Sequence, residues 1–187
     1  MAAVAIRSMA AAALLVLSGC GDIFGNKDPH QPGNDLGVFR VTASLLQSSC
    51  GDGALGSPAS WQFDVKLSRS DRVLYWHNGA EVIIGSLAED GVTFAFDAGI
   101  VINMRTEEDI GLPPCSMARH DHADGTLATG EPDVPVDSFS ANLSYEFKPT
   151  EGSECTDLVM SETPVFAALP CAMIYQVSAV RTDPPVK

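Results

Sequence analysis

A short polar run in the second half of the chain carries the residue types best suited to chemistry. His120, His122 and Asp124 occupy every other position, so on a β-strand their side chains point to one face. Two imidazoles and a carboxylate match the ligands of zinc or copper, and His77 or an acid from another strand would complete the set. The alternative is an outward-facing polar strand ending at an Asp124-Gly125 turn. We favour the alternative and expect no cofactor.

The same run offers a second candidate site. If the histidines face outward, Arg119 and Asp121 face the protein interior together with Met117 and Ala123. A buried Arg–Asp pair perturbs the pKa of both groups and can mark a pocket, although such internal pairs are just as often structural.

Motifs for catalysis and for nucleic-acid binding are absent from the sequence. There is no Gly-x-Ser-x-Gly nucleophile elbow, and disulfide pairing of the cysteines would remove every thiol. Lysines and arginines are scattered singly in a chain of formal net charge −13, which disfavours nucleic acid as a partner. We therefore expect a non-catalytic protein that does not bind nucleic acid.

The cysteine count points to disulfide bonds. Five cysteines are present (Cys20, Cys50, Cys115, Cys155 and Cys171), and an odd number leaves one unpaired in an exported protein. If Cys20 is modified separately, the other four form two disulfides, for which three pairings exist. We expect Cys50–Cys115 and Cys155–Cys171, because the second bridge would close a short connection between two strands. A zinc site of four thiolates lacks the usual Cys-x-x-Cys spacing.

The N-terminal segment carries an export signal. Arg7 precedes a run of apolar or small residues, 8–19, that ends in Leu17-Ser18-Gly19-Cys20. The run is shorter than the roughly 20 residues of a bilayer-spanning helix and suits a signal peptide. It resembles the lipobox of bacterial lipoproteins, which implies cleavage before Cys20 and attachment of diacylglycerol to its sulfur. Two or more acyl chains would then anchor the protein stably to a membrane.

The same resemblance bears on location in the cell envelope. An Asp directly after the lipidated cysteine would resemble a signal for retention in the inner membrane, but Gly21 stands there, which favours the outer membrane. Cleavage would remove Arg7 as the only charged side chain of residues 1–19, so the formal net charge becomes −14.

We expect a signal peptide over 1–19, a lipidated cysteine and flexible tether over 20–36, and a single β-domain over 37–187. Cys50-Gly51-Asp52-Gly53 and Leu169-Pro170-Cys171 are similar to segments of small uncharacterised lipoproteins of myxobacteria and related bacteria, which imply no activity.

The remaining pattern predicts an all-β domain with little helix. Apolar residues alternate with polar ones from Trp61 to Leu67 and from Phe139 to Phe147, which is typical of strands with one buried face. Turn signals at Asn78-Gly79, Asp90-Gly91 and Ala98-Gly99 divide the middle of the chain into hairpins, and Thr106–Ile110 could form one helical turn. The expected strands are Gly37–Gln47, Trp61–Leu67, Arg72–His77, Ala80–Ser86, Val92–Asp97, Ile100–Arg105, Ser116–Ala123, Ser138–Lys148 and Ala172–Arg181. About eight to ten short antiparallel strands favour an up-and-down barrel, lipocalin-like in outline, over a sandwich.

These expectations give an envelope-anchored lipoprotein whose β-domain is a binding or structural module. Its partners would be the membrane, through the lipid, and an unknown protein or small molecule. One alternative is a carrier of a small ligand in the barrel cavity, although large inward residues such as Trp61, Phe63 and Phe139 favour a filled barrel. The other alternative is a metal-binding protein that uses His120 and His122.

Overall fold

The computed structural model describes residues 32–79, 81–106, 111–131 and 134–182. The predicted signal peptide, Cys20 and the tether up to residue 31 lie outside the described residues, as do residues 107–110 of the predicted helical turn.

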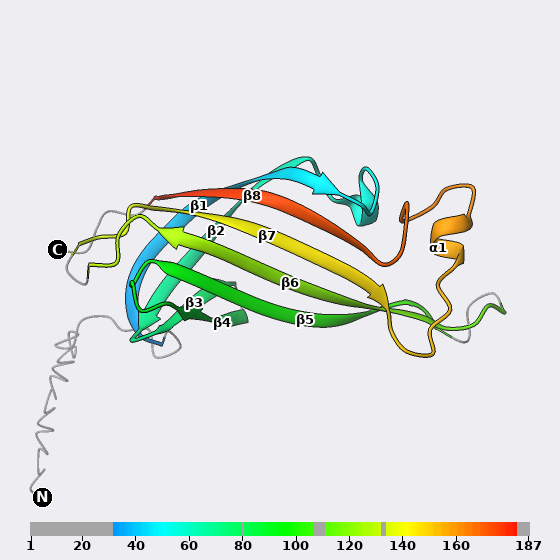
Figure 1. The fold of residues 1–187 in the computed structure, drawn as a ribbon, viewed down its shortest axis with the longest axis horizontal. Coiled ribbons are helices and arrows are strands. Elements are labelled where there is room, and N and C mark those ends of the chain that lie inside the picture. Colours follow the sequence, from blue (N-terminus) through cyan, green and yellow to red (C-terminus); the bar gives the residue numbers. More distant parts are fainter. Residues whose placement is uncertain (1–31, 80, 107–110, 132–133, 183–187) are drawn as a thin grey trace, which may run out of the picture. The chain divides into compact units, whose positions relative to one another are not determined.

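The described residues form a closed antiparallel barrel of eight strands (Figure 1). Each strand pairs with the next one along the chain, and the last strand pairs with the first. The predicted all-β class and antiparallel up-and-down order are confirmed, and the barrel, not the sandwich, is the architecture. The strands are β1 (Asn34–Ser48), β2 (Ser60–Ser70), β3 (Val73–Asn78), β4 (Glu81–Leu87), β5 (Thr93–Arg105), β6 (Cys115–Leu127), β7 (Ser138–Pro149) and β8 (Cys171–Arg181), with a 3-10 turn η1 (Ala54–Gly56) and one helical turn α1 (Asp157–Met160).

Alternation of side chains along the strands builds the core. In β2, Val65 and Leu67 are buried and Trp61 and Phe63 half-buried, whereas the polar residues between them lie on the outer face. β7 repeats the pattern, and its Phe139 ring packs edge-on against Phe39 of β1, 5.4 Å away between centroids. The alternation that the sequence predicted for both strands is therefore confirmed.

Two predicted turns are wrong, because β5 runs unbroken through Ala98-Gly99 and β6 through Asp124-Gly125. Gly125 is needed for a different reason. A Cβ atom there would lie 2.5 Å from Cζ of Phe94 and 2.4 Å from the carbonyl oxygen of Ser140, so the position has room only for glycine. The glycine marks a close approach of neighbouring strands, not the end of one.

The start of the domain also differs from the prediction. β1 begins at Asn34, so the last three residues assigned to the tether belong to the barrel. Leu36 is buried, and a carboxylate oxygen of Asp35 accepts a hydrogen bond of 2.9 Å from the N–H of Gly37. These contacts fold the segment onto the first strand although its composition is that of a linker.

The disulfides are Cys50–Cys171 and Cys115–Cys155, so all four predicted cysteines are paired but the expected pairing is wrong. Closure of the barrel places the end of β1 beside the start of β8, where the N–H of Ser49 donates to the carbonyl of Ala172. Cys50 therefore faces Cys171 across 121 residues of sequence. The expected pairing was chosen for the short loop between Cys155 and Cys171. Spacing along the chain carries no information on barrel closure, which decides the actual pairing.

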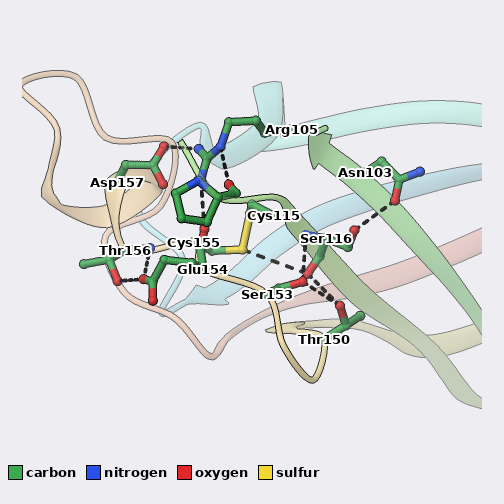
Figure 2. The surroundings of a disulfide bond; sticks show 11 residues. Asn103, Arg105, Cys115, Ser116, Thr150, Ser153, Glu154, Cys155, Thr156 and Asp157 are labelled. Atoms are coloured by element: carbon green, nitrogen blue, oxygen red, sulfur yellow. Dashed lines mark hydrogen bonds and ion pairs between the residues drawn. A yellow bond between two sulfur atoms is a disulfide. The ribbon is translucent and has the colours of Figure 1, made fainter. Parts of the chain in front are cut away.

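A buried arginine connects the loops at the disulfide end. A β-bulge between Asn103 and Arg105 turns Arg105 inward, and its side chain is only 8% exposed. Figure 2 shows its guanidinium beside Cys115–Cys155 and joined to Asp157. Nη1 lies 2.5 Å from Asp157 Oδ2. Nε and Nη2 donate to the carbonyls of Pro113 and Glu154, each at 2.8 Å. One side chain thus joins the β5–β6 and β7–β8 connections.

Arg105→Met is expected to lower the free energy of unfolding by about 2 kcal/mol, because it leaves a carboxylate and two carbonyls without their donor. Urea unfolding checks this value. The control is Arg72→Met, since Arg72 pairs with Glu89 on the surface, where both side chains are mostly exposed, and such pairs contribute about 0.5 kcal/mol or less. Equal losses in the two variants would contradict the role given to Arg105.

Candidate functional site

The predicted metal ligands lie on the outer face of β6. His122 Nδ1 is 2.8 Å from Asp97 Oδ1 on β5, and His120 Nε2 is 3.4 Å from the same oxygen. Asp124 Oδ1 lies 3.8 Å from His122 Nε2. Asp97 Oδ1 therefore lies close to both imidazoles.

His77 does not join this group. Its Nε2 lies 2.9 Å from the hydroxyl oxygen of Ser68 on β2. Within the described ranges, no three His, Cys, Asp or Glu side chains are grouped so that they could hold a metal ion. The arrangement around Asp97 is a row of neighbouring polar side chains on a partly exposed strand face.

Arg119 and Asp121 face the barrel interior, because the odd-numbered residues of β6 point inward. Nε and Nη2 of Arg119 each donate to one carboxylate oxygen of Asp121, both at 2.7 Å. The guanidinium carbon lies 5.5 Å from the centre of the Tyr145 ring on β7. The two side chains are 31% and 22% exposed, so this bidentate pair is largely shielded from solvent but still accessible.

An interior cavity of about 410 Å³ surrounds this pair. This volume falls within the range of about 300–1,000 Å³ that is usual for small-molecule sites. Five aromatic side chains from four strands line it (Trp61, Phe63, Trp76, Phe96 and Tyr145), and Asn78 and Glu81 lie at its rim. A mostly apolar wall with few convergent polar groups is typical of a binding pocket. The barrel is therefore not completely filled, contrary to what its large inward residues favoured.

The cavity adjoins a break in the barrel wall between β4 and β5. Their pairing stops at Gly85 with Phe96, although β5 continues for nine more residues. The strands β3 and β4 are short, as Figure 1 shows. Ile83, Ala98 and Ile100 lie along the unpaired stretch and also line the cavity. We expect this unpaired stretch, called the lateral opening below, to be the route between the cavity and solvent.

Alternation of the antiparallel ladder predicts which amides face the opening. The N–H of Leu127 donates to the carbonyl of Val92, so even-numbered residues of β5 bond to β6 and odd-numbered ones point to the β4 side. We expect the amides of Gly99 and Val101 to exchange with deuterium much faster than those of Ile100 and Ile102. Residue-resolved exchange by NMR measures this, and equal protection would mean that the β4–β5 wall is closed.

The environment of Tyr145 keeps its hydroxyl neutral. Burial raises the pKa of Tyr145 to about 12, and the nearby Asp121 carboxylate adds to the rise. In an unfolded chain a tyrosine ionises near pH 10, so the unfolded state loses this proton first as the pH increases. The stabilisation from neutral Tyr145 is therefore complete below about pH 10 and is lost towards about pH 12.

Ionisation of Tyr145 is expected to lower the free energy of unfolding of the wild type by roughly 2 kcal/mol between about pH 9 and pH 12. Tyr145→Phe should lack this part of the decrease. Urea unfolding at several alkaline pH values measures the difference from the wild type. Tyr75→Phe is the matched control, because Tyr75 lies on the outer face of β3 and does not line the cavity. The prediction is wrong if both variants follow the wild-type pH profile.

A larger depression of about 740 Å³ lies over the outer face of β5 to β8. Backbone and short outward side chains such as Gly99, Ala118 and Ala172 form much of its floor, with His120 and Lys148 beside them. It lacks the aromatic wall of the interior cavity. We therefore take the interior cavity as the candidate site.

Sequence reasoning identified part of this site. It placed Trp61 and Phe63 on the inner face, and Arg119 with Asp121 there in the second interpretation. Within the expected strand Arg72–His77, the structure places Trp76 inside. Glu81 and Phe96 had no signal of their own, because their position at the cavity follows from where the β4–β5 pairing ends.

Among the described residues, no helix is long and apolar enough to cross a membrane. Comparison of the chain with protein-family models, with curated protein sequences and with solved structures gave no match.

Proposed function

We propose that this chain is an envelope-anchored lipoprotein whose barrel binds one small, largely apolar molecule without transforming it. The observation that carries the proposal is the aromatic-lined interior cavity with its Arg119–Asp121 pair. An ion pair inside an apolar wall supplies the few oriented polar groups by which such pockets position a ligand. This binding role makes the general expectation of a binding module more specific.

Two further features support the proposed anchor and the location outside the cytoplasm. The lipobox ending in Cys20 supplies an anchor, and two disulfides suit an oxidising compartment. We propose the outer membrane as the location because Gly21 follows the cysteine. Metabolic labelling with palmitate tests the anchor. The wild type should incorporate label and Cys20→Ser should not, and an unlabelled wild type would refute the anchor.

The binding test uses the protein's own fluorescence. The chain has two tryptophans, and both Trp61 and Trp76 line the cavity. The complete mature chain with Cys20→Ser, exported behind a cleavable leader, is titrated with the apolar dye 1-N-phenylnaphthylamine. We expect saturable binding of one dye per chain, with quenching of tryptophan emission. Absence of saturable binding would refute the proposed function.

Matched variants locate the dye. Ala98→Phe places a ring in the cavity, whereas Ala118→Phe places the same ring in the outer depression. We expect Ala98→Phe to weaken binding at least about tenfold, because the added ring occupies the ligand volume, and Ala118→Phe to leave it unchanged. The opposite order would assign binding to the outer face and refute the cavity as the site.

A further inference from the structure

The cavity wall holds hydrogen-bond donors that lack acceptors. Arg119 uses Nε and Nη2 on Asp121, but its Nη1 has no partner in the described residues. The hydroxyl of Tyr145 likewise has none there, and the buried indole N–H of Trp61 is also unpartnered. Of these three donors only the Trp61 N–H is fully buried. Nη1 of Arg119 and the Tyr145 hydroxyl stay accessible on side chains that line the cavity, so a ligand there can pair with them.

These side chains supply hydrogen-bond donors to a ligand in the cavity. Both carboxylate oxygens of Asp121 already accept from Arg119, and an indole N–H can only donate. Tyr145 keeps its proton because its pKa is about 12. Asp121 and Tyr145 are directly paired residues on neighbouring strands, and the guanidinium lies over the Tyr145 ring. The free donors of Arg119 and Tyr145 thus occupy the same part of the cavity.

The electrostatics of the cavity argue against an anionic ligand. The charge of Arg119 is balanced by Asp121, and Glu81 adds a negative charge at the rim. The whole chain has a formal net charge of −13, so long-range attraction favours cations and repels anions. An uncharged acceptor meets the donors without this penalty.

We infer that the ligand is an uncharged molecule with a flat apolar body and a carbonyl-type oxygen, an ester, ketone or amide, that accepts hydrogen bonds from Arg119 Nη1 and Tyr145. This inference rests on the proposed function. The aromatic rings hold the flat body, and the donors fix the end that carries the oxygen. The Arg119–Asp121 pair is then a positioning element, because Asp121 holds the guanidinium edge-on and leaves Nη1 free.

Three fluorescent probes with one shared ring system test the inference on the same exported chain. They are 2-(dimethylamino)naphthalene, methyl 6-(dimethylamino)-2-naphthoate and the corresponding free carboxylate, which differ in having no acceptor, a neutral acceptor and an anionic acceptor. We expect the ester to bind about tenfold more tightly than the acceptor-free probe, as one or two net hydrogen bonds would give. The ester should also bind more tightly than the carboxylate.

Variants identify the donors. Tyr145→Phe should reduce the advantage of the ester about fivefold, and Tyr75→Phe should retain it. The double variant Arg119→Met with Asp121→Leu removes the pair without leaving an unpaired acid, and it should abolish the remaining advantage while the acceptor-free probe still binds.

The outcomes separate the two proposals. Equal affinity for all three probes, or tightest binding of the carboxylate, would overturn the inference and leave the cavity as a binding site. An advantage of the ester that survives all the variants would also overturn it. Failure of every probe to bind would refute the proposed function itself.

Discussion

Replacing both Cys50 and Cys171 with alanine is expected to lower the free energy of unfolding by about 5 kcal/mol. The bridge closes a loop of 121 residues, and in the chain-entropy model a loop of this length restricts the unfolded chain by about that amount. It also joins β1 to β8, the seam at which the barrel closes. Urea unfolding of the double variant under oxidising conditions, compared with the wild type, measures the loss.

The second disulfide is the internal control. Cys115–Cys155 spans 40 residues, so the corresponding double alanine variant should lose about 4 kcal/mol. Both variants remove two thiols and one bridge, and they differ mainly in loop length. A larger loss for Cys115–Cys155 would show that the loop-length argument does not govern stability here.

Gly125→Val is expected to destabilise the protein by at least about 3 kcal/mol. Strand propensity alone predicts the opposite sign, because valine favours strands and glycine weakens them. A Cβ at position 125 would nevertheless lie 2.4 Å from the Ser140 carbonyl oxygen, 2.5 Å from Phe94 Cζ and 2.7 Å from Ala141 Cβ. Overpacking of this kind displaces backbone as well as side chains. Thermal unfolding followed by tryptophan fluorescence measures the change.

Gly99→Val provides the matched control on the neighbouring strand. The nearest atom to a Cβ at Gly99 is the carbonyl oxygen of Arg119, at 3.8 Å, so valine fits and should leave stability unchanged or slightly higher. Similar destabilisation by both substitutions would contradict the packing argument for Gly125.

The predictable part of the fold is the part that depends on local alternation. Trp61–Leu67 and Phe139–Phe147 alternate apolar and polar residues, and each set was correctly placed on the inner face. The glycine-based turns at Ala98-Gly99 and Asp124-Gly125 were wrong because glycine also occurs where strands approach closely, and local sequence does not distinguish the two causes.

The disulfide pairing and the cavity depend on non-local features of the fold. The disulfide pairing depends on β1 meeting β8, which follows only from closure of the whole sheet. The cavity depends on β3 and β4 being shorter than their neighbours and on the pairing of β4 with β5 ending at Gly85. Arg119 and Asp121 could be assigned to the interior by alternation, but the opening beside them could not be predicted from any single segment.

Pairing of the last strand with the first has a consequence for how the polypeptide matures. β1 lacks one of its two neighbours until β8 has been synthesised, and the two strands meet over Phe39–Ser48 and Met173–Arg181. Until then, an unfinished sheet presents free main-chain groups and apolar side chains such as Val41, which invite pairing with other chains. Assembly of the barrel therefore completes only after β8 has emerged, and a holding chaperone would be most useful during that interval.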